Sequence, residues 1–312
     1  MDSSVKISHL SPMELARRLR QEGLILRIGP FAARLQSSVA RVAENIGILY
    51  GQYPTENNST FVDFHVRLAP PRNLRRWVRP QVLFFFDGRS PFRPLPVDQA
   101  FALFEWGMNW CVAKHSNQYL IIHAAVIERD GCAVIMAAPP GTGKSTLCAG
   151  LVVHGWRLLS DELALISPLD RSLTPLPRPV GLKNESIDLI RNFAPGVTLG
   201  PECADTSKGV VAHMKAPEKS VARADERAMP AWIVCPRYEK GTPAKLERRS
   251  KAQTFMYIVK NAFNYNVHGL KGYRTIASLI DRCDCYDFTY SRLEEAIEIF
   301  DGLVPPQAVV SG

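Results

Sequence analysis

The first third of the chain carries both strand and helix patterns. Every second residue is apolar in one stretch, as in a half-buried strand: Val62, Phe64, Val66 and Leu68. Apolar runs predict further strands at residues 24–28 and 82–86. A capping box at residues 11–14, with Pro12 at the first helical position, predicts the start of a helix. Asp98 is expected to cap a second helix, which carries Trp106 and Trp110.

The pattern changes near residue 116, where longer apolar runs begin. The runs at 119–128 and 132–137 are separated by Asp130-Gly131, a dipeptide typical of a tight β-hairpin. Helices are expected up to His154, at 184–193, and after capping boxes at 250–253 and 291–294. Strands are expected at 157–159, 163–166, 209–214 and 232–235. We therefore predict a small α+β N-terminal domain (1–115), an α/β core domain (116–303) and a loose tail (304–312).

Composition narrows the class of protein. The chain has 312 residues, of which 46% are hydrophobic and 22% charged, values that exclude a mainly disordered chain, collagen or a coiled coil. No apolar run approaches the roughly 18 residues that cross a bilayer, and the N-terminus lacks a secretory signal. Seven scattered cysteines indicate reduced thiols. These features predict a cytoplasmic protein without a membrane partner.

The net charge of +8 favours anionic partners such as a nucleotide, an acidic peptide or nucleic acid. Part of the excess lies in an arginine cluster at residues 72–79. Only Trp77 accompanies these arginines, whereas a nucleic-acid surface usually interleaves more basic and aromatic residues. A solvated loop is the simpler interpretation of this cluster, so the sequence argues against a nucleic-acid partner. It leaves open whether the chain forms a homo-oligomer.

The sharpest signal is a glycine-rich stretch between a predicted strand and a predicted helix, which matches a relaxed Walker A pattern. It comprises Ala138, Pro139, Pro140, Gly141, Thr142, Gly143, Lys144, Ser145 and Thr146. Glycines let backbone N–H groups surround phosphate oxygens, and the helix N-terminus favours the same anion. Lys144 is expected to contact the β- and γ-phosphates of ATP, and Ser145 to bind Mg²⁺. The alternative, a glycine-rich turn that happens to end in Lys-Ser, has less support from this context.

Two adjacent acids, Asp161 and Glu162, end the apolar stretch that follows the predicted helix. An acid at the end of a strand beside the phosphate loop is the Walker B arrangement. We expect a crossover that returns this strand beside the one before the loop. One acid would then hold Mg²⁺ and the other would take a proton from a hydroxyl. A surface or helix-capping Asp-Glu pair remains the alternative.

These motifs resemble HPr kinase/phosphorylase, and more closely its offshoot, the HprK-related kinase A family. The core resemblance lies in His123-Ala124-Ala125-Val126, the loop, and residues 155–162 (GWRLLSDE). The offshoot is supported by elements at 74–81, 179–184, 236–238 and 264–266. The resemblance spans about residues 10–302.

The resemblance implies a P-loop kinase core of the HPr kinase/PEP-carboxykinase type, with a mixed sheet. It assigns Asp161 to the substrate hydroxyl, gives Glu162 the place of the second, metal-side acid, and makes His123 a site residue. A core histidine is the alternative for His123. The motif for dephosphorylation is not intact, and a PqqD-like peptide-modification system is implied as the partner.

Two cations, Lys183 and Arg237, follow predicted strands and are candidates to neutralise the transferring phosphoryl group, with solvated surface positions as the alternative. Cys283 and Cys285 are separated by one residue and have no second pair of cysteines, so they are a weak candidate for a metal site. The sequence therefore predicts an ATP- and Mg²⁺-dependent kinase acting on a serine or another hydroxyl of a peptide or small protein. An ATP-binding regulatory module and a small-molecule kinase stay open as alternatives.

Overall fold

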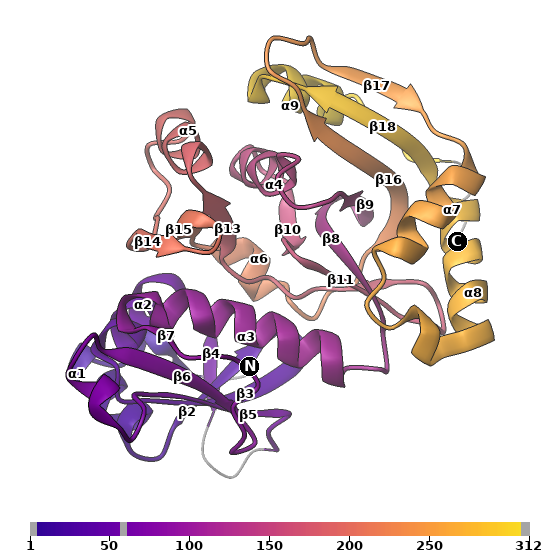
Figure 1. The fold of residues 1–312 in the computed structure, drawn as a ribbon. Helices are drawn as coiled ribbons and strands as arrows, with labels where there is room; N and C mark the ends of the chain where they lie inside the picture. The colour runs from indigo at the N-terminus through magenta and orange to yellow at the C-terminus, as the bar shows by residue number, and fades with distance from the viewer. Residues whose placement is uncertain (1–4, 57–60, 307–312) are drawn as a thin grey trace.

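Three β-sheets organise residues 5–56 and 61–306, which are the residues that the computed structural model describes (Figure 1). Parallel and antiparallel strand pairs occur in both large sheets, and helices pack against them, so the chain is mixed α/β. Of the predicted tail, residues 307–312 lie outside the described residues. No described helix is both long and apolar enough to cross a bilayer.

The first sheet belongs to the N-terminal part of the chain. Its strand order is β1 (Val5–Lys6), β4 (Pro54–Glu56), β2 (Leu24–Ile28), β3 (Phe31–Ser37), β5 (Phe64–Ala69), β6 (Gln81–Phe86) and β7 (Leu95–Pro96). Helices α1 (Pro12–Arg20), α2 (Ala40–Leu49) and α3 (Ala100–His115) accompany it. The capping box is confirmed, because Ser11 Oγ accepts a hydrogen bond from Glu14 N. Helix α3 lies between this sheet and the rest of the molecule (Figure 1).

The second sheet has the order β12 (Leu173–Thr174), β11 (Leu163–Ile166), β8 (Leu120–Arg129), β9 (Cys132–Ala137), β16 (Met229–Tyr238), β18 (Asp284–Tyr290) and β17 (Lys245–Arg248), with β10 (Arg157–Ser160) also on β8. Strands β9, β16 and β18 are parallel, whereas β8 is antiparallel to β9. The third sheet is β13 (Val180–Lys183), β15 (Gly209–Met214) and β14 (Cys203–Thr206). The other helices are α4 (Lys144–Val153), α5 (Glu185–Phe193), α6 (Glu218–Ala222), α7 (Lys251–Lys260), α8 (Tyr265–Arg282) and α9 (Leu293–Asp301).

The hairpin prediction is confirmed, because Asp130 and Gly131 both take positive φ between β8 and β9. The expected neighbour of β10 is wrong: β10 pairs antiparallel with β8, which separates it from β9. Because β8 and β9 form a hairpin, β8 occupies the edge of β9 beside which β10 was expected. The strand end that carries the acids is thus one strand farther from the loop than expected.

Two predicted helix caps are wrong. Asp98 lies in a short 3-10 turn, where its carboxylate is 3.4 Å from Arg41 Nη2, and α3 begins after Gln99 without a side-chain cap. Ser291 donates its hydroxyl to Thr242 O, and Arg292 occupies the N-cap of α9. In both cases a tertiary partner takes the group that was expected to cap the helix.

A buried ion pair joins α3 to the second part of the chain. Arg178 pairs with Glu105, and its guanidinium also donates to Glu105 O at 2.8 Å and to Asn109 Oδ1 at 2.6 Å. Tyr50 donates its hydroxyl to Glu105 Oε1 at 2.6 Å. One apolar core continues from the first sheet through α3 to the helices of the second part. Residues 5–56 and 61–115 are therefore packed onto the rest of the chain rather than tethered to it.

Candidate functional site

The candidate phosphate loop connects β9 to α4. Ala138 is buried at the end of β9, whereas Pro139, Pro140 and Gly141 are exposed. Gly141 and Gly143 have φ of 87° and 86°, which is left-handed backbone that favours glycine. A Cβ on Gly143 would lie 2.5 Å from Tyr290 Oη, so this position also lacks space for a side chain.

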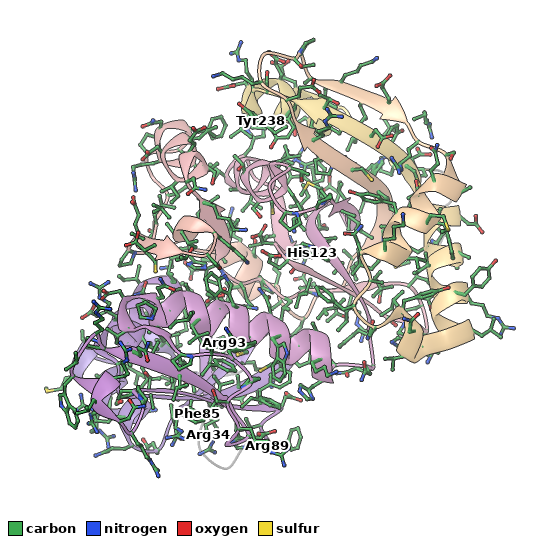
Figure 2. All side chains as sticks on the ribbon, viewed as in Figure 1. Arg34, Phe85, Arg89, Arg93, His123 and Tyr238 are labelled. Atoms are coloured by element: carbon green, nitrogen blue, oxygen red, sulfur yellow. The ribbon has the colours of Figure 1, made fainter. Side chains whose placement is uncertain are left out.

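Two tyrosines hold the loop against the second sheet. Tyr238 N donates to Thr142 O at 2.8 Å, and Tyr290 donates its hydroxyl to Gly143 O at 2.8 Å. Within the loop, Thr142 Oγ1 donates to Pro139 O at 2.9 Å. Ser145 and Thr146 follow in the first turn of α4, and both are partly exposed. Figure 2 labels Tyr238 above His123, which lies near the middle of the view.

Lys144 is the centre of a cluster of charged side chains. Its side chain is only 6% exposed, and its Nζ donates to Asp161 O at 3.0 Å. The same Nζ lies 3.8 Å from Glu162 Oε2 and 3.5 Å from His123 Nε2. His123 Nε2 is in turn 2.8 Å from Glu162 Oε2. Strand β8, the loop and the end of β10 thus bring three predicted site residues to Lys144.

The two acids have different surroundings because β10 ends at Ser160, just before them. Asp161 is buried, and its Oδ2 accepts a hydrogen bond from Gly181 N at 3.0 Å. Its Oδ1 is buried without a hydrogen-bond partner. Glu162 is 31% exposed and opens toward solvent beside His123. The expected division of roles, with Glu162 as the metal-side acid, stays a prediction.

The pKa directions of the pair follow these surroundings. Burial and the neighbouring Glu162 raise the pKa of Asp161, although Lys144, the Gly181 N–H and the Ser145 hydroxyl act in the opposite direction. Burial alone would also raise the pKa of Glu162, but the hydrogen bond with His123 and the charge of Lys144 hold it well below its usual range. Glu162 is therefore an ionised acceptor, and Asp161 is a buried carboxyl group whose Oδ1 has no hydrogen-bond partner.

The residues present fit a magnesium ion. Mg²⁺ prefers hard oxygen ligands and takes only one or two from the protein. Asp161 Oδ1 has no partner, and the Ser145 hydroxyl is close enough to lower the pKa of the same carboxyl group. The described residues contain no group of three or more His, Cys, Asp or Glu that could hold a metal by themselves.

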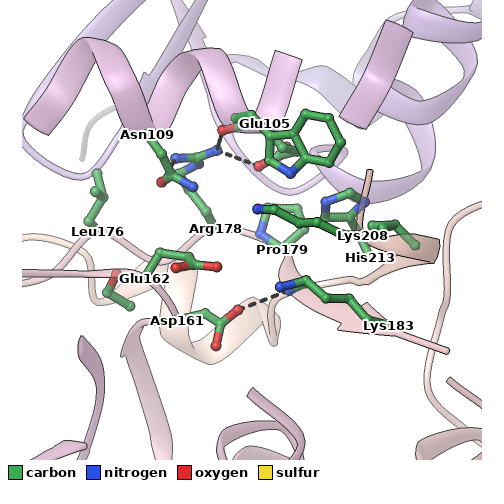
Figure 3. Close-up of a pocket in the computed structure, with 14 residues that line it drawn as sticks. Glu105, Asn109, Asp161, Glu162, Leu176, Arg178, Pro179, Lys183, Lys208 and His213 are labelled. Carbon is green, nitrogen blue, oxygen red and sulfur yellow. Dashed lines mark hydrogen bonds and ion pairs between the residues drawn. The ribbon is translucent and has the colours of Figure 1, made fainter. Parts of the chain in front are cut away.

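The two cations predicted from strand ends lie in different places. Lys183 ends β13 and lines a pocket with Asp161 and Glu162, and its charge contributes to the low pKa of Glu162 (Figure 3). Arg237 lies near the end of β16 with 72% of its side chain exposed, 3.5 Å from Glu239. Arg237 lines neither of the cavities that contain the acids.

A second cavity of about 380 Å³, here called the cleft, opens beside the acids between α3 and the second sheet. Its lining comprises Trp106, Asn109, Trp110, Ala113, Lys114, His123, Glu162, Leu163, Lys208 and Phe263. Glu162, Lys208, Trp106 and Asn109 line both cavities, so the cleft and the pocket in Figure 3 meet at these residues. Half of the cleft wall comes from the N-terminal part of the chain.

Sequence reasoning missed Lys208, which lies in the turn between β14 and β15. Its Nζ is 5.0 Å from the centre of the Trp106 ring. Burial, Lys183 and Lys144 lower the pKa of Lys208, so this lysine lies near the other two cations. No motif surrounds Lys208 in the sequence. The spacing of Trp106 and Trp110, one helical turn apart, is a local signal from which an aromatic wall could have been inferred.

Comparisons with known proteins give limited matches. The profile of the family described as SynChlorMet cassette protein ScmC matches residues 103–177, which run from α3 past both acids. No curated protein matches the sequence. Among solved structures, the Hpr(Ser) kinase/phosphatase from Coxiella burnetii matches 58% of this chain and 95% of its own, with 12% identity and a TM-score of 0.26. A likeness this low carries no argument about function, so the case for function rests on the site itself.

Proposed function

We propose that this chain is an ATP- and Mg²⁺-dependent kinase that phosphorylates a serine or another hydroxyl of a peptide or small protein. The observation that carries the proposal is the cluster at Lys144. A lysine that ends a glycine-rich loop meets the backbone carbonyl of Asp161, the carboxylate of Glu162 and a histidine, beside an open cleft. Phosphoryl transfer requires mainly positioning and electrostatic stabilisation, and these residue types supply both.

In this proposal the loop N–H groups and Lys144 hold the phosphates of ATP. Ser145 and Asp161 hold Mg²⁺, which neutralises charge on the phosphates when it is bound. A divalent cation at Oδ1 would stabilise the ionised form of Asp161 and offset the cost of burying it. We therefore assign the metal to Asp161 rather than to Glu162, on the evidence of their surroundings.

Glu162 then serves the acceptor. It is ionised, lies next to His123, and faces the cleft, so its carboxylate is placed to accept a hydrogen bond from an incoming hydroxyl. Lys183 and Lys208 are cations of the adjoining pocket and would stabilise charge on the transferring group. Arg237 has no such contact and would act only on a part of the nucleotide that extends beyond the loop.

The proposed division into residues 1–115 and 116–303 gives each part a role. The loop and both acids belong to the second part, which would bind ATP. Helix α3 of the first part supplies the other wall of the cleft and would help to bind the acceptor. A carrier of the PqqD-like type remains our proposal for the partner. An ATP-binding regulatory module is the second candidate. It is favoured by the distance of 3.8 Å between Lys144 Nζ and Glu162 Oε2, which is too long for a hydrogen bond.

The test is incubation of the full chain with ATP, Mg²⁺ and polypeptides encoded beside it, followed by intact-mass measurement. A gain of about 80 Da on one polypeptide, absent with Lys144→Ala, would support the kinase. ATP binding without any gain would favour the regulatory module. Equal ATP affinity for the parent chain and Lys144→Ala would reject the phosphate-loop assignment itself.

A further inference from the structure

Large apolar side chains are exposed on and just before α8. Phe263 is 53% exposed, and Val267 and Leu270, four and seven residues farther along the chain, are 68% and 64% exposed. Tyr273 is 49% exposed. Exposed apolar residues are common singly, but a run of them marks an interaction site. We name these four residues, with Lys271 and Arg274, the α8 surface.

The charge of this region has one sign. Residues 252–280 contain no aspartate or glutamate, while Lys260, Lys271 and Arg274 lie among the exposed apolar residues. These three cations have no ion-pair partner among residues 5–56 and 61–306. The α8 surface therefore complements an apolar segment that carries negative charge.

Phe263 connects this surface to the candidate site. It lines the cleft, and the centre of its ring is 6.0 Å from that of His123. Backbone hydrogen bonds fix this position, because Phe263 N donates to Ile121 O at 2.9 Å and His123 N donates to Asn261 O at 2.8 Å. Phe263 is thus both exposed and part of the cleft wall, so a segment bound at α8 can reach the cleft at this residue.

We propose that the α8 surface docks an acidic segment with large apolar side chains, which belongs to the polypeptide acceptor and leads its hydroxyl through the cleft to Glu162. The proposal rests on the kinase function and specifies its substrate class. A cleft of about 380 Å³ accommodates only part of a polypeptide, so the remainder needs a surface outside it. A second copy of this chain is a poorer occupant, because a two-fold contact would bring Lys271 and Arg274 close to their own copies.

The experiment measures binding without ATP. Two fluorescent peptides share one serine and the same leucine and phenylalanine positions, with glutamates in one and lysines in the other. Fluorescence anisotropy is recorded with the full chain, with Val267→Ser/Leu270→Ser, and with Lys271→Glu/Arg274→Glu. Matched controls are Met13→Ser, at an apolar side chain that is 82% exposed, and Arg20→Glu, both on α1.

We expect the acidic peptide to bind at least about tenfold more tightly than the basic one, and Lys271→Glu/Arg274→Glu to remove most of this difference. Val267→Ser/Leu270→Ser should weaken the binding of both peptides, because both carry the same apolar side chains. Equal affinity for both peptides, or unchanged binding by the two α8 variants, would overturn the proposal. A parent dimer that Val267→Ser/Leu270→Ser dissociates in light scattering would assign the surface to a second copy instead. Binding that depends on α8, in a chain that phosphorylates no acceptor, would retain the docking surface and reject the kinase.

Discussion

The buried pair Glu105–Arg178 should contribute more to stability than any surface ion pair in the chain. Glu105→Gln keeps the shape of the side chain and its hydrogen bond with Tyr50, but leaves the Arg178 guanidinium buried without a counter-charge. Removing one partner of a buried pair typically costs about 3–5 kcal/mol. Two neutral acceptors of Arg178 remain, Asn109 Oδ1 and Glu105 O, so we expect about 3 kcal/mol.

The assay is urea unfolding, followed by tryptophan fluorescence, because Trp106 and Trp110 flank this contact on α3. The control is Glu14→Gln, which breaks an exposed pair with Arg17 and should change the midpoint little. Loss of the pair should also weaken binding of peptides in the cleft, since α3 forms one wall. If Glu105→Gln unfolds at the same urea concentration as Glu14→Gln, the pair does not hold the two parts together and this reasoning is wrong.

Three further predictions concern the site. Lys144→Ala should weaken ATP binding and abolish transfer without changing the fold, as calorimetry and circular dichroism would measure; unchanged affinity and activity would contradict it. Asp161→Asn should remove the Mg²⁺ dependence of ATP binding, whereas Glu162→Gln should keep ATP affinity and lower turnover by about 10²-fold. If these two phenotypes are exchanged in binding and turnover assays, the opposite assignment of the acids is correct. Gly143→Ala should cost about 1–2 kcal/mol through its positive φ and further weaken ATP binding, because the new Cβ would displace Tyr290. Unfolding and calorimetry test it, and normal ATP affinity would speak against a tightly packed loop.

Features that depend on neighbours in the sequence were predictable. The hairpin at Asp130-Gly131, the glycine-rich loop and the acid pair at a strand end all follow from local pattern, and the structure has them at the expected positions. Strand β15 matches its predicted bounds for the same reason. These elements contain consistent local preferences, which is why single-sequence reasoning is sufficient for them.

Features that depend on distant segments were not predictable. Helix α8 was missed because Gly269 and Gly272 interrupt its apolar pattern, and Gly269 indeed has non-helical backbone angles. Strand β18 was missed because Asp284 and Asp287 break its apolar run; both pair with arginines from the adjoining segment 248–249. Lys208 reaches the site only through the pairing of β14 with β15. The predicted neighbour of β10 was wrong for the same reason, because no local pattern in the sequence shows that β8 lies between β9 and β10.

The two tyrosine contacts on the loop have a consequence for the peptide groups that they hold. In a trans peptide the carbonyl and the next N–H point in opposite directions. Because Thr142 O accepts from Tyr238 N and Gly143 O accepts from the Tyr290 hydroxyl, the N–H groups of Gly143 and Lys144 point away from these two tyrosines. In the proposed kinase, these donors are oriented before the phosphate arrives. The conformational entropy of these loop residues is lost when the chain folds. Binding of a nucleotide would therefore not require the loop to lose it a second time.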